Sequence, residues 1–340
     1  FTPYSVDKHK LERFFNLNLA GVTIKKFGKF ISRLPSLDSY KNSLYVRTIG
    51  MLNDYDLVID TGTNGWFSKK IKPKTICYVH FPYFQPMKRG IKRITNFLLV
   101  KPKNAFQYDV IVCNSNFTKR CVERYTNKDL IVINPPVQVE KIKPGKKSDI
   151  IVTIGRFSYD KKHEVMIEAF KELCKRVRGY TFHIIGSFQK NVRLYKKEYL
   201  DMLIKKAEGY PIEFHINMPH DDVLKFLGKS KIYWHARGYG ETDLNEYENF
   251  GITTVEAMAA GCVPVVINLG AQPEIVNHSS NGYCWNNPKE LVSYTANIIS
   301  DSRLMRRLAS NARRKSLSYS SSVFKRKILK VIKDLTSSPQ

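Results

Sequence analysis

Short apolar runs that alternate with longer amphipathic stretches constrain the fold of this 340-residue chain more than any other feature. Such alternation is typical of parallel sheets that are covered by helices on both faces. It predicts strands in the first half at residues 22–24, 56–60, 75–79, 109–113 and 130–133. Five more are predicted at residues 150–154, 181–185, 212–216, 231–235 and 263–267. We therefore expect an α/β protein with two Rossmann-like sheets.

The length and the composition predict two domains. A chain of 340 residues exceeds one ordinary domain, and its 43% of hydrophobic residues provide material for sizeable cores. Residues 137–149 are rich in Lys, Pro and Gly and lack apolar periodicity, which predicts a linker. The expected order is an N-terminal domain (1–136), this linker, a C-terminal domain (150–318), and a C-terminal helix and tail (319–340).

The chain is strongly basic, because its 56 Lys and Arg residues outnumber its 30 Asp and Glu residues and give a net charge of +26. Such an excess attracts polyanions or forms a solubilising surface. Charge alone permits a nucleic-acid-binding protein, but the sequence has no helix-turn-helix, zinc module or aromatic RNA-binding signature, so nucleic acid is not an expected partner. The basic and apolar segment Met87–Val100 either lies on an anionic lipid surface or forms an ordinary helix with a basic outer face.

Metal sites and membrane spans are not expected. The six cysteines show no C-x-x-C spacing, which favours a reducing compartment and no metal cluster. Asp54 and Asp56 have the D-x-D form, but they precede a buried strand far in sequence from the other motifs. No apolar stretch reaches the roughly 18 residues that a span needs, and the chain opens with Phe1-Thr2-Pro3 rather than a basic and apolar leader. A cytoplasmic location is expected.

Two carboxylates separated by seven residues, Glu248 and Glu256, enclose the segment that most strongly indicates function. Between them, Gly251 lets the backbone approach a ligand closely, and a helix is predicted to begin just after it. The amino end of a helix offers unpaired N–H groups and partial positive charge to an anion. Glu256 is expected one to two turns into this helix.

Two further motifs follow predicted strands. Gly155-Arg156-Phe157-Ser158-Tyr159-Asp160-Lys161 lies between a strand and a helix, where nucleotide ligands settle. Arg156 and Lys161 can neutralise a diphosphate there, with Lys162 as the alternative to Lys161. His80 ends a buried strand in Cys77-Tyr78-Val79-His80-Phe81-Pro82, and is either a site residue or a structural histidine.

Together these motifs resemble the family 4 glycosyltransferases of GT-B fold. The segment from Glu248 to Gly261 is similar to the family's E-x-F-G and E-A-M-A-x-G elements, and Gly155 to Lys161 looks like its G-R-x4-K element. The Y-V-H-F-P form around His80 is most similar to the Alg11-type mannosyltransferases that extend dolichol-linked oligosaccharides. The resemblance implies two Rossmann-like domains that face each other across a cleft, the N-terminal one on the acceptor side.

The resemblance also implies roles for single residues. Glu248 is expected to contact the donor sugar near its reacting carbon, and His80 to contact the sugar from the other domain. Arg156 and Lys161 are expected to stabilise the leaving diphosphate, and no metal is expected. Glu256 is expected to hydrogen-bond the ribose hydroxyls. The other donor-binding residues implied are Phe250, Gly251, Ile252, Gly155 and Met218.

The expected function is a retaining transfer of a hexose by front-face attack. Mannose from GDP-mannose is favoured as donor, a UDP-sugar is the alternative, and no cofactor is required. The acceptor is expected to be a lipid-linked or other glycan, with the protein peripheral on the cytoplasmic face of an anionic membrane.

Other readings stay open. The front of the chain shows no strand followed by a glycine-rich loop before Val22, so the chain is either a fragment or remodelled there. A noncatalytic glycosyltransferase-like subunit or a sugar-nucleotide-binding protein is therefore the alternative. The paired carboxylate and G-R-x4-K elements argue against a GT-B phosphorylase or epimerase.

Overall fold

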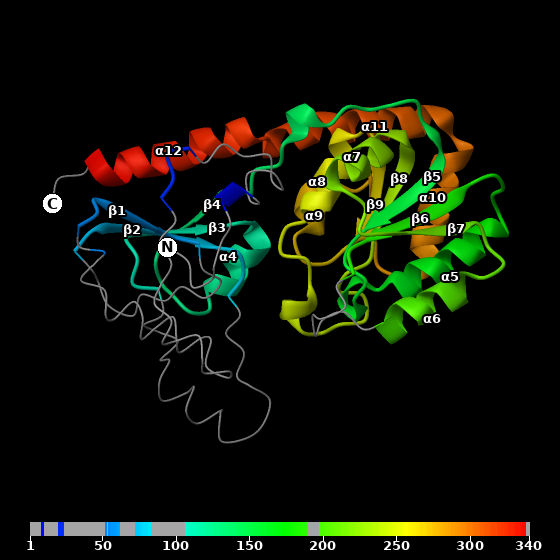
Figure 1. The fold of residues 1–340 in the computed structure, drawn as a ribbon, viewed down its shortest axis with the longest axis horizontal. Helices are drawn as coiled ribbons and strands as arrows, with labels where there is room; N and C mark the ends of the chain where they lie inside the picture. Colours follow the sequence, from blue (N-terminus) through cyan, green and yellow to red (C-terminus); the bar gives the residue numbers. More distant parts are fainter. Residues whose placement is uncertain are drawn as a thin grey trace, which may run out of the picture.

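The computed structural model describes residues 8–9, 20–23, 52, 54–61, 72–82, 106–188 and 197–337. Within them the chain forms two parallel sheets with helices packed on them, which confirms the predicted α/β class (Figure 1). Val22 and Thr23 lie outside any strand, so the strand predicted at 22–24 is wrong there. Three apolar or β-branched residues do not specify a strand without a partner to complete the ladder. The segment Met87–Val100 lies outside the described residues, as does most of the chain before residue 52.

The first sheet contains four parallel strands in sequence order. They are β1 (Leu57–Asp60), β2 (Lys74–Val79), β3 (Val110–Cys113) and β4 (Leu130–Val132). The short helix α4 (Asn116–Val122) follows β3, and Ser115 caps it by accepting a 3.0 Å hydrogen bond from the amide of Thr118. Asp109 fixes the approach to β3, because its carboxylate accepts from both the amide and the hydroxyl of Thr75 at 2.8 Å.

The second sheet has the strand order β10-β9-β8-β5-β6-β7. Its strands are β5 (Ser148–Ile154), β6 (Thr181–Gly186), β7 (Ile212–Ile216), β8 (Ser230–His235), β9 (Val263–Ile267) and β10 (Tyr283–Trp285). The sequence predicts the first five but not β10, whose three residues are too few for a period-2 pattern and gain their register from β9. The order reverses between β5 and β8, and ligands of open α/β sheets bind beyond the carboxyl ends of strands at such a switch point.

Helices cover both faces of the second sheet (Figure 1). The first face carries α5 (His163–Cys174), α6 (Lys197–Ala207) and α10 (Pro288–Ser300), and the other carries α7 (His220–Lys229) and α8 (Ile252–Ala259). The helices α9 (Gln272–Ile275) and α11 (Ser302–Ser316) complete this half. The apolar stripe predicted for α5 is buried at Met166, Ala169, Phe170 and Leu173. None of the described helices has the length and apolar character needed to cross a bilayer.

The last helix, α12 (Ser321–Ser337), returns to the first sheet (Figure 1). Its apolar residues pack against Ile76, Tyr78 and Val112, and the contributing side chains are Phe324, Ile328, Val331, Ile332 and Leu335. The chain passes between the two halves twice, near Val137 and near Tyr319. These two segments lie side by side, because the amide of Val137 donates to the carbonyl of Tyr319 at 3.0 Å. A C-terminal helix was predicted at 319–340, but its amphipathic pattern does not say which sheet it covers. The predicted domain boundaries stay predictions.

Direct contacts also join the two halves. Ser115 Oγ donates to the carbonyl of Asn249 at 2.7 Å. The carboxylate of Glu274 accepts from the amides of Asn116 at 2.8 Å and Phe117 at 2.6 Å, so a residue of the second half caps α4 of the first. The ring of Phe117 stacks on Tyr247, with centroids 6.0 Å apart. These contacts hold the segment around Glu248 against the carboxyl end of the first sheet.

Candidate active site

The turn after β5 positions two of the predicted cations. Arg156 lies 3.6 Å from the carboxylate of Asp160, and Lys161 ends the short 3-10 helix Tyr159–Lys161. A Cβ on Gly155 would come within 3.2 Å of Lys161 Cγ and 3.3 Å of its Cδ. The stem of Lys161 therefore lies directly across Gly155, and this contact requires a residue without a large side chain.

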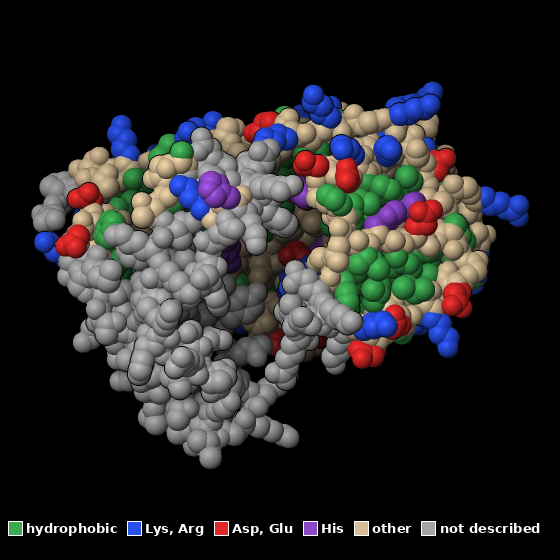
Figure 2. Space-filling model, in the orientation of Figure 1, with side chains coloured by type: hydrophobic (Ala, Val, Ile, Leu, Met, Phe, Trp, Pro, Cys, Tyr) green, Lys and Arg blue, Asp and Glu red, His purple; other side chains and the backbone are tan. Residues whose placement is uncertain are grey.

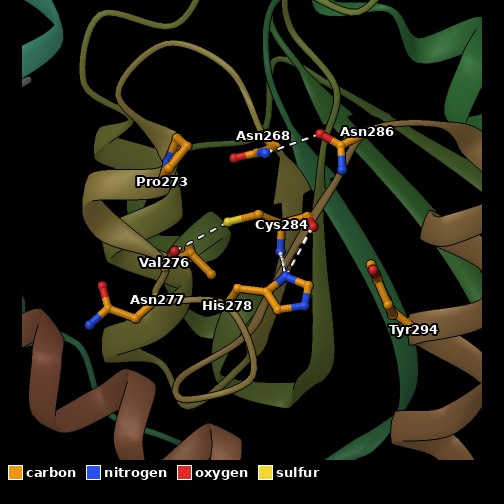
Figure 3. A pocket seen from close by; sticks show the side chains of 8 residues that line it. All are labelled: Asn268, Pro273, Val276, Asn277, His278, Cys284, Asn286 and Tyr294. Carbon is orange, nitrogen blue, oxygen red and sulfur yellow. Dashed lines mark hydrogen bonds between the residues drawn. The ribbon is translucent and has the colours of Figure 1, made fainter.

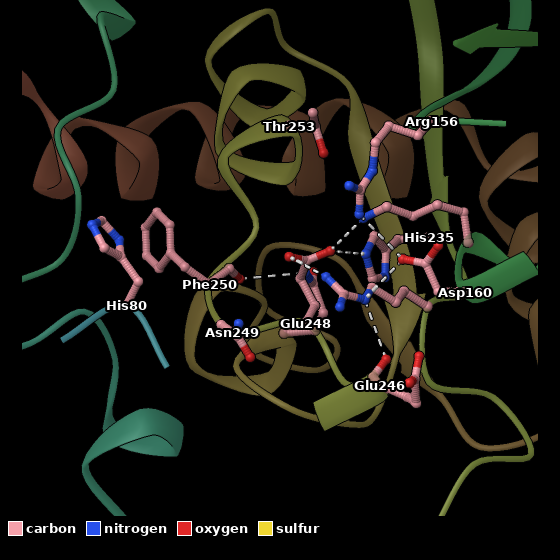
Figure 4. Close-up of polar contacts among 12 residues, drawn as sticks. His80, Arg156, Asp160, His235, Glu246, Glu248, Asn249, Phe250 and Thr253 are labelled. Carbon is pink, nitrogen blue, oxygen red and sulfur yellow. Dashed lines mark hydrogen bonds and ion pairs between the residues drawn. The ribbon is translucent and has the colours of Figure 1, made fainter. Parts of the chain in front are cut away.

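Glu248 is the centre of a charged cluster at the carboxyl ends of β5 and β8 (Figure 4). Its carboxylate lies 3.0 Å from Lys161 Nζ, 3.3 Å from His235 Nε2 and 3.5 Å from a guanidinium nitrogen of Arg237. Burial opposes ionisation of this carboxyl, but Lys161, His235 and Arg237 outweigh it and hold the pKa of Glu248 well below its ordinary range. Glu248 is therefore a half-buried carboxylate that stays ionised at neutral pH.

The backbone at Glu248 is fixed by a tight turn before α9. The amide of Ala271 donates to the carbonyl of Glu248 at 2.9 Å. Gly270 has φ +63°, and a Cβ there would come within 2.5 Å of the same carbonyl oxygen. Only glycine accepts both the left-handed backbone and this close approach, so the turn requires Gly270.

Gly251 starts α8 in a conformation that other residues rarely adopt. Its φ is +116°, and a Cβ would come within 2.4 Å of Gln272 Nε2. No side chain caps α8, so its first-turn amides are of the kind that binds an anion. Ile252 is exposed beside them, whereas the ring of Phe250 is buried against Tyr319. Phe250 can therefore offer a ligand only its backbone.

Glu256 lies in the second turn of α8, as predicted, and is 8% exposed. Burial raises its pKa to about 7. His220 Nε2 of α7 lies 3.7 Å from its carboxylate. A carboxyl group that titrates near neutrality can accept hydrogen bonds when ionised and donate one when protonated, which suits contact with hydroxyl groups.

His80 and Met218 are placed differently from the charged cluster. His80 is exposed at the end of β2 and approaches from the first half (Figure 4), with its ring edge-on to Tyr78 at 5.2 Å. Its carbonyl accepts from Asn114 Nδ2 at 2.7 Å, which fixes the strand end. Met218 follows β7 and packs, half-buried, against the core beneath α8. Neither residue is joined to Glu248 by a contact within the part of the chain that the structure describes.

Three residues of the cluster were missed by sequence reasoning. They are Asp160, His235 and Arg237. Asp160 forms ion pairs with Arg156 and Arg237, while His235 and Arg237 contact Glu248 directly. The position of His235 at the end of β8 was an available signal, because site residues gather at strand ends. The structure also separates the two lysines, since Lys162 pairs with Glu241 and only Lys161 contacts Glu248.

A cavity beside β9 and the pair Asp54 and Asp56 both lie apart from this cluster. A cavity of about 470 Å³ lies between β9, α9 and α10 (Figure 3), and its lining includes Asn268, His278, Cys284 and Tyr294. It contains none of the predicted site residues. Asp54 and Asp56 are exposed at the amino end of β1, whereas the cluster lies beyond the carboxyl ends of strands of the other sheet.

Known proteins with similar sequences are glycosyltransferases. Residues 136–315 match the family model described as glycosyl transferases group 1. A GDP-Man:Man(3)GlcNAc(2)-PP-Dol alpha-1,2-mannosyltransferase of Dictyostelium discoideum is 26% identical over 224 residues, which are 61% of this chain and 43% of that protein. Its namesake of Xenopus tropicalis is 31% identical over 180 residues, 48% of this chain and 34% of that protein. The matched parts therefore span less than half of these relatives.

Solved structures confirm the GT-B fold. A glycosyltransferase from Rickettsia africae superposes with a TM-score of 0.68 at 19% identity, over 93% of this chain and 85% of that one. At this level of identity the likeness extends to the fold and not to the substrate.

Proposed function

The chain belongs to the glycosyl transferases group 1 family, and from this premise we propose that it is a retaining glycosyltransferase. In this proposal it moves mannose from GDP-mannose to a lipid-linked glycan acceptor. The observation that carries the proposal is the half-buried cluster in which Lys161 and Glu248 lie 3.0 Å apart, beside the uncapped amino end of α8. Positive charge and a fixed carboxylate then lie together where a sugar diphosphate needs both.

The proposed donor position follows from these charges. The diphosphate lies at the amino end of α8, with Arg156 and Lys161 as cations on its other side. The side chain of Arg156 is 40% exposed and its guanidinium lies 3.6 Å from Asp160, which also pairs with Arg237, so Arg156 can turn to a phosphate without leaving Asp160 unpaired. Glu256 hydrogen-bonds the ribose hydroxyls from inside α8. No metal is needed in this scheme, because the two cations neutralise the charge of the leaving group.

The proposed reaction proceeds on one face of the sugar. The bond between the anomeric carbon and the diphosphate oxygen breaks as the acceptor oxygen bonds to that carbon, and the acceptor proton passes to a departing phosphate oxygen. Arg156 and Lys161 stabilise the charge that grows on the diphosphate. Glu248 stays ionised and orients the sugar, and His80 contacts it from the first half. The products are the glycoside, with retained configuration, and the nucleoside diphosphate.

The acceptor and the location are part of the same proposal. The relatives in Dictyostelium and Xenopus are named for a GDP-mannose donor and a PP-Dol glycan. The surface along α11 and α12 carries exposed cations (Figure 2), which are Arg303, Arg306, Arg307, Arg313, Arg314, Lys325, Arg326, Lys327, Lys330 and Lys333. These charges favour a peripheral position on the cytoplasmic face of an anionic membrane, beside a lipid-linked acceptor.

Calorimetric titration with GDP-mannose, UDP-glucose and UDP-N-acetylglucosamine tests the donor, and a radiolabel transfer assay with dolichol-linked glycans tests the reaction. We expect selective binding of GDP-mannose and transfer that falls about 100-fold or more in kcat for Lys161→Met. Arg178→Ala removes an exposed cation that follows α5, away from the basic surface of α11 and α12, and serves as the control for charge. Binding without transfer would instead support the noncatalytic subunit, and a UDP-sugar preference would reject mannose from GDP-mannose.

A further inference from the structure

Three potential metal ligands converge on one face of the second sheet, away from the charged cluster. His183 lies on β6, and Glu213 and His215 lie on β7. In the parallel register His183 pairs with Glu213, and His215 pairs with Ile185. Glu213 and His215 are two residues apart, and side chains at that spacing share one face of a strand. The pairing of β6 with β7 therefore brings all three side chains together.

We propose that His183, Glu213 and His215 bind a divalent transition-metal ion, with Zn²⁺ as the favoured ion. Nδ1 of His183 lies 2.9 Å from Nε2 of His215 and 3.5 Å from a carboxylate oxygen of Glu213. That oxygen is 3.9 Å from His215 Nε2. Ligand bonds of about 2.0–2.2 Å in a tetrahedral site place ligand atoms roughly 3.4 Å apart. Changes of about half an ångström in side-chain position complete the geometry.

A further hydrogen bond prepares His183 to act as a ligand. Its Nε2 lies 2.9 Å from Thr181 Oγ1. Donation from Nε2 to that hydroxyl leaves the lone pair of Nδ1 facing His215 and Glu213, which is the arrangement that orients metal-binding histidines.

The surroundings of the three side chains also fit a metal site. Phe226 of α7 packs on both imidazoles, with ring centroids 4.9 Å from His183 and 5.0 Å from His215, and so holds their planes. The imidazoles are nearly parallel, at an interplanar angle of 16°. Glu213 is 60% exposed, which leaves a path for the ion and room for a water as the fourth ligand. Two imidazoles and one carboxylate form a donor set that suits Zn²⁺.

The position of the site indicates what the metal would do. β7 is the edge strand of its sheet, and an ion shared with β6 would fasten it there. β7 leads directly into Asn217, whose side chain exchanges hydrogen bonds of 2.8 and 2.9 Å with the backbone of Phe188. The metal would therefore brace the turn that carries Met218. This site does not depend on the function proposed above, because it shares no residue with the charged cluster.

The test is metal binding by the full chain after treatment with a chelator. Calorimetry with ZnCl₂ is expected to show one ion per chain with micromolar or tighter affinity, and Zn²⁺ is expected to raise the melting temperature. Co²⁺ is expected to give visible absorption of an N/O site. His215→Gln and Glu213→Gln are expected to weaken binding 10- to 100-fold, while the metal-free melting temperature of Glu213→Gln stays that of the parent.

Two variants serve as matched controls. Glu208→Gln removes an exposed carboxylate that is not one of the three proposed ligands, and His220→Gln removes an exposed histidine on α7. Both variants are expected to bind Zn²⁺ as the parent does.

Absence of Zn²⁺ binding by the parent chain would overturn the proposal and leave His183 and His215 as a hydrogen-bonded histidine pair. Binding that survives Glu213→Gln and His215→Gln, or a Co²⁺ spectrum with a thiolate charge-transfer band, would overturn it as well.

Discussion

Replacing Glu256 with Gln is expected to stabilise the chain at pH 8 and to change its stability much less at pH 5. Glu256 is 8% exposed, and burial raises the pKa of its carboxyl group from 4.5 to about 7. The folded state therefore holds its proton more tightly than the unfolded state does. Ionisation opposes folding, and this penalty is absent below about pH 4.5, grows as the pH rises, and is complete above about pH 7.

The magnitude follows from the two pKa values. A difference of about 2.5 pKa units corresponds to about 3 kcal/mol, at about 1.4 kcal/mol per unit. The penalty is therefore about 3 kcal/mol at pH 8 and about 1 kcal/mol at pH 5. The contact with His220 at 3.7 Å offsets little of this ionisation penalty, because an ion pair with an exposed partner contributes less than about 1 kcal/mol. Gln keeps the shape of Glu256 without the charge.

The assay is urea denaturation followed by tryptophan fluorescence at pH 5, 6, 7 and 8. Trp234 and Trp285 are fully buried in the core of the second sheet and report on the half that contains α8. Glu208→Gln is the control, since that carboxylate is exposed. A gain for Glu256→Gln that does not grow between pH 5 and pH 8, or no gain at pH 8, would refute the reasoning. The same variant is expected to bind GDP-mannose more weakly.

Three other substitutions test the geometry around the charged cluster. Gly155→Ala would place a methyl group 3.2 Å from Lys161 Cγ, and we expect transfer to fall at least 10-fold in kcat while the melting temperature changes little. Gly270→Ala combines φ +63° with a 2.5 Å contact to the carbonyl of Glu248 and is expected to destabilise the chain by about 1–3 kcal/mol in urea denaturation. Glu274→Ala removes the carboxylate that accepts from the first two amides of α4, while Ser115 still caps the helix, and is expected to speed amide hydrogen exchange at Asn116 and Phe117. Unchanged kcat, unfolding midpoint or exchange rate, respectively, would contradict each expectation.

The sequence by itself determined the features that depend on local pattern. Apolar runs and amphipathic spacing predicted nine of the strands that the structure contains, and the stripe on α5. Gly251 has a positive φ that disfavours a side chain, and Gly155 lies in tight contact with the stem of Lys161, so both glycines of these motifs have a local structural reason. Because nucleotide ligands settle beyond the carboxyl ends of parallel strands, the turn from Gly155 to Lys161 was expected to bind one.

Only the tertiary structure decided which of these residues are partners. The spacing favoured Lys161 and kept Lys162 as the alternative, and the structure shows that Lys162, whose backbone is left-handed (φ 55°), pairs with Glu241 while Lys161 pairs with Glu248. The pairing of His183 with Glu213 required the register of β6 on β7. Likewise α12 covers a sheet that ends about 190 residues earlier in the chain. Periodicity is a property of neighbouring residues, whereas strand order and crossover path join residues distant in sequence, and no local pattern encodes that choice.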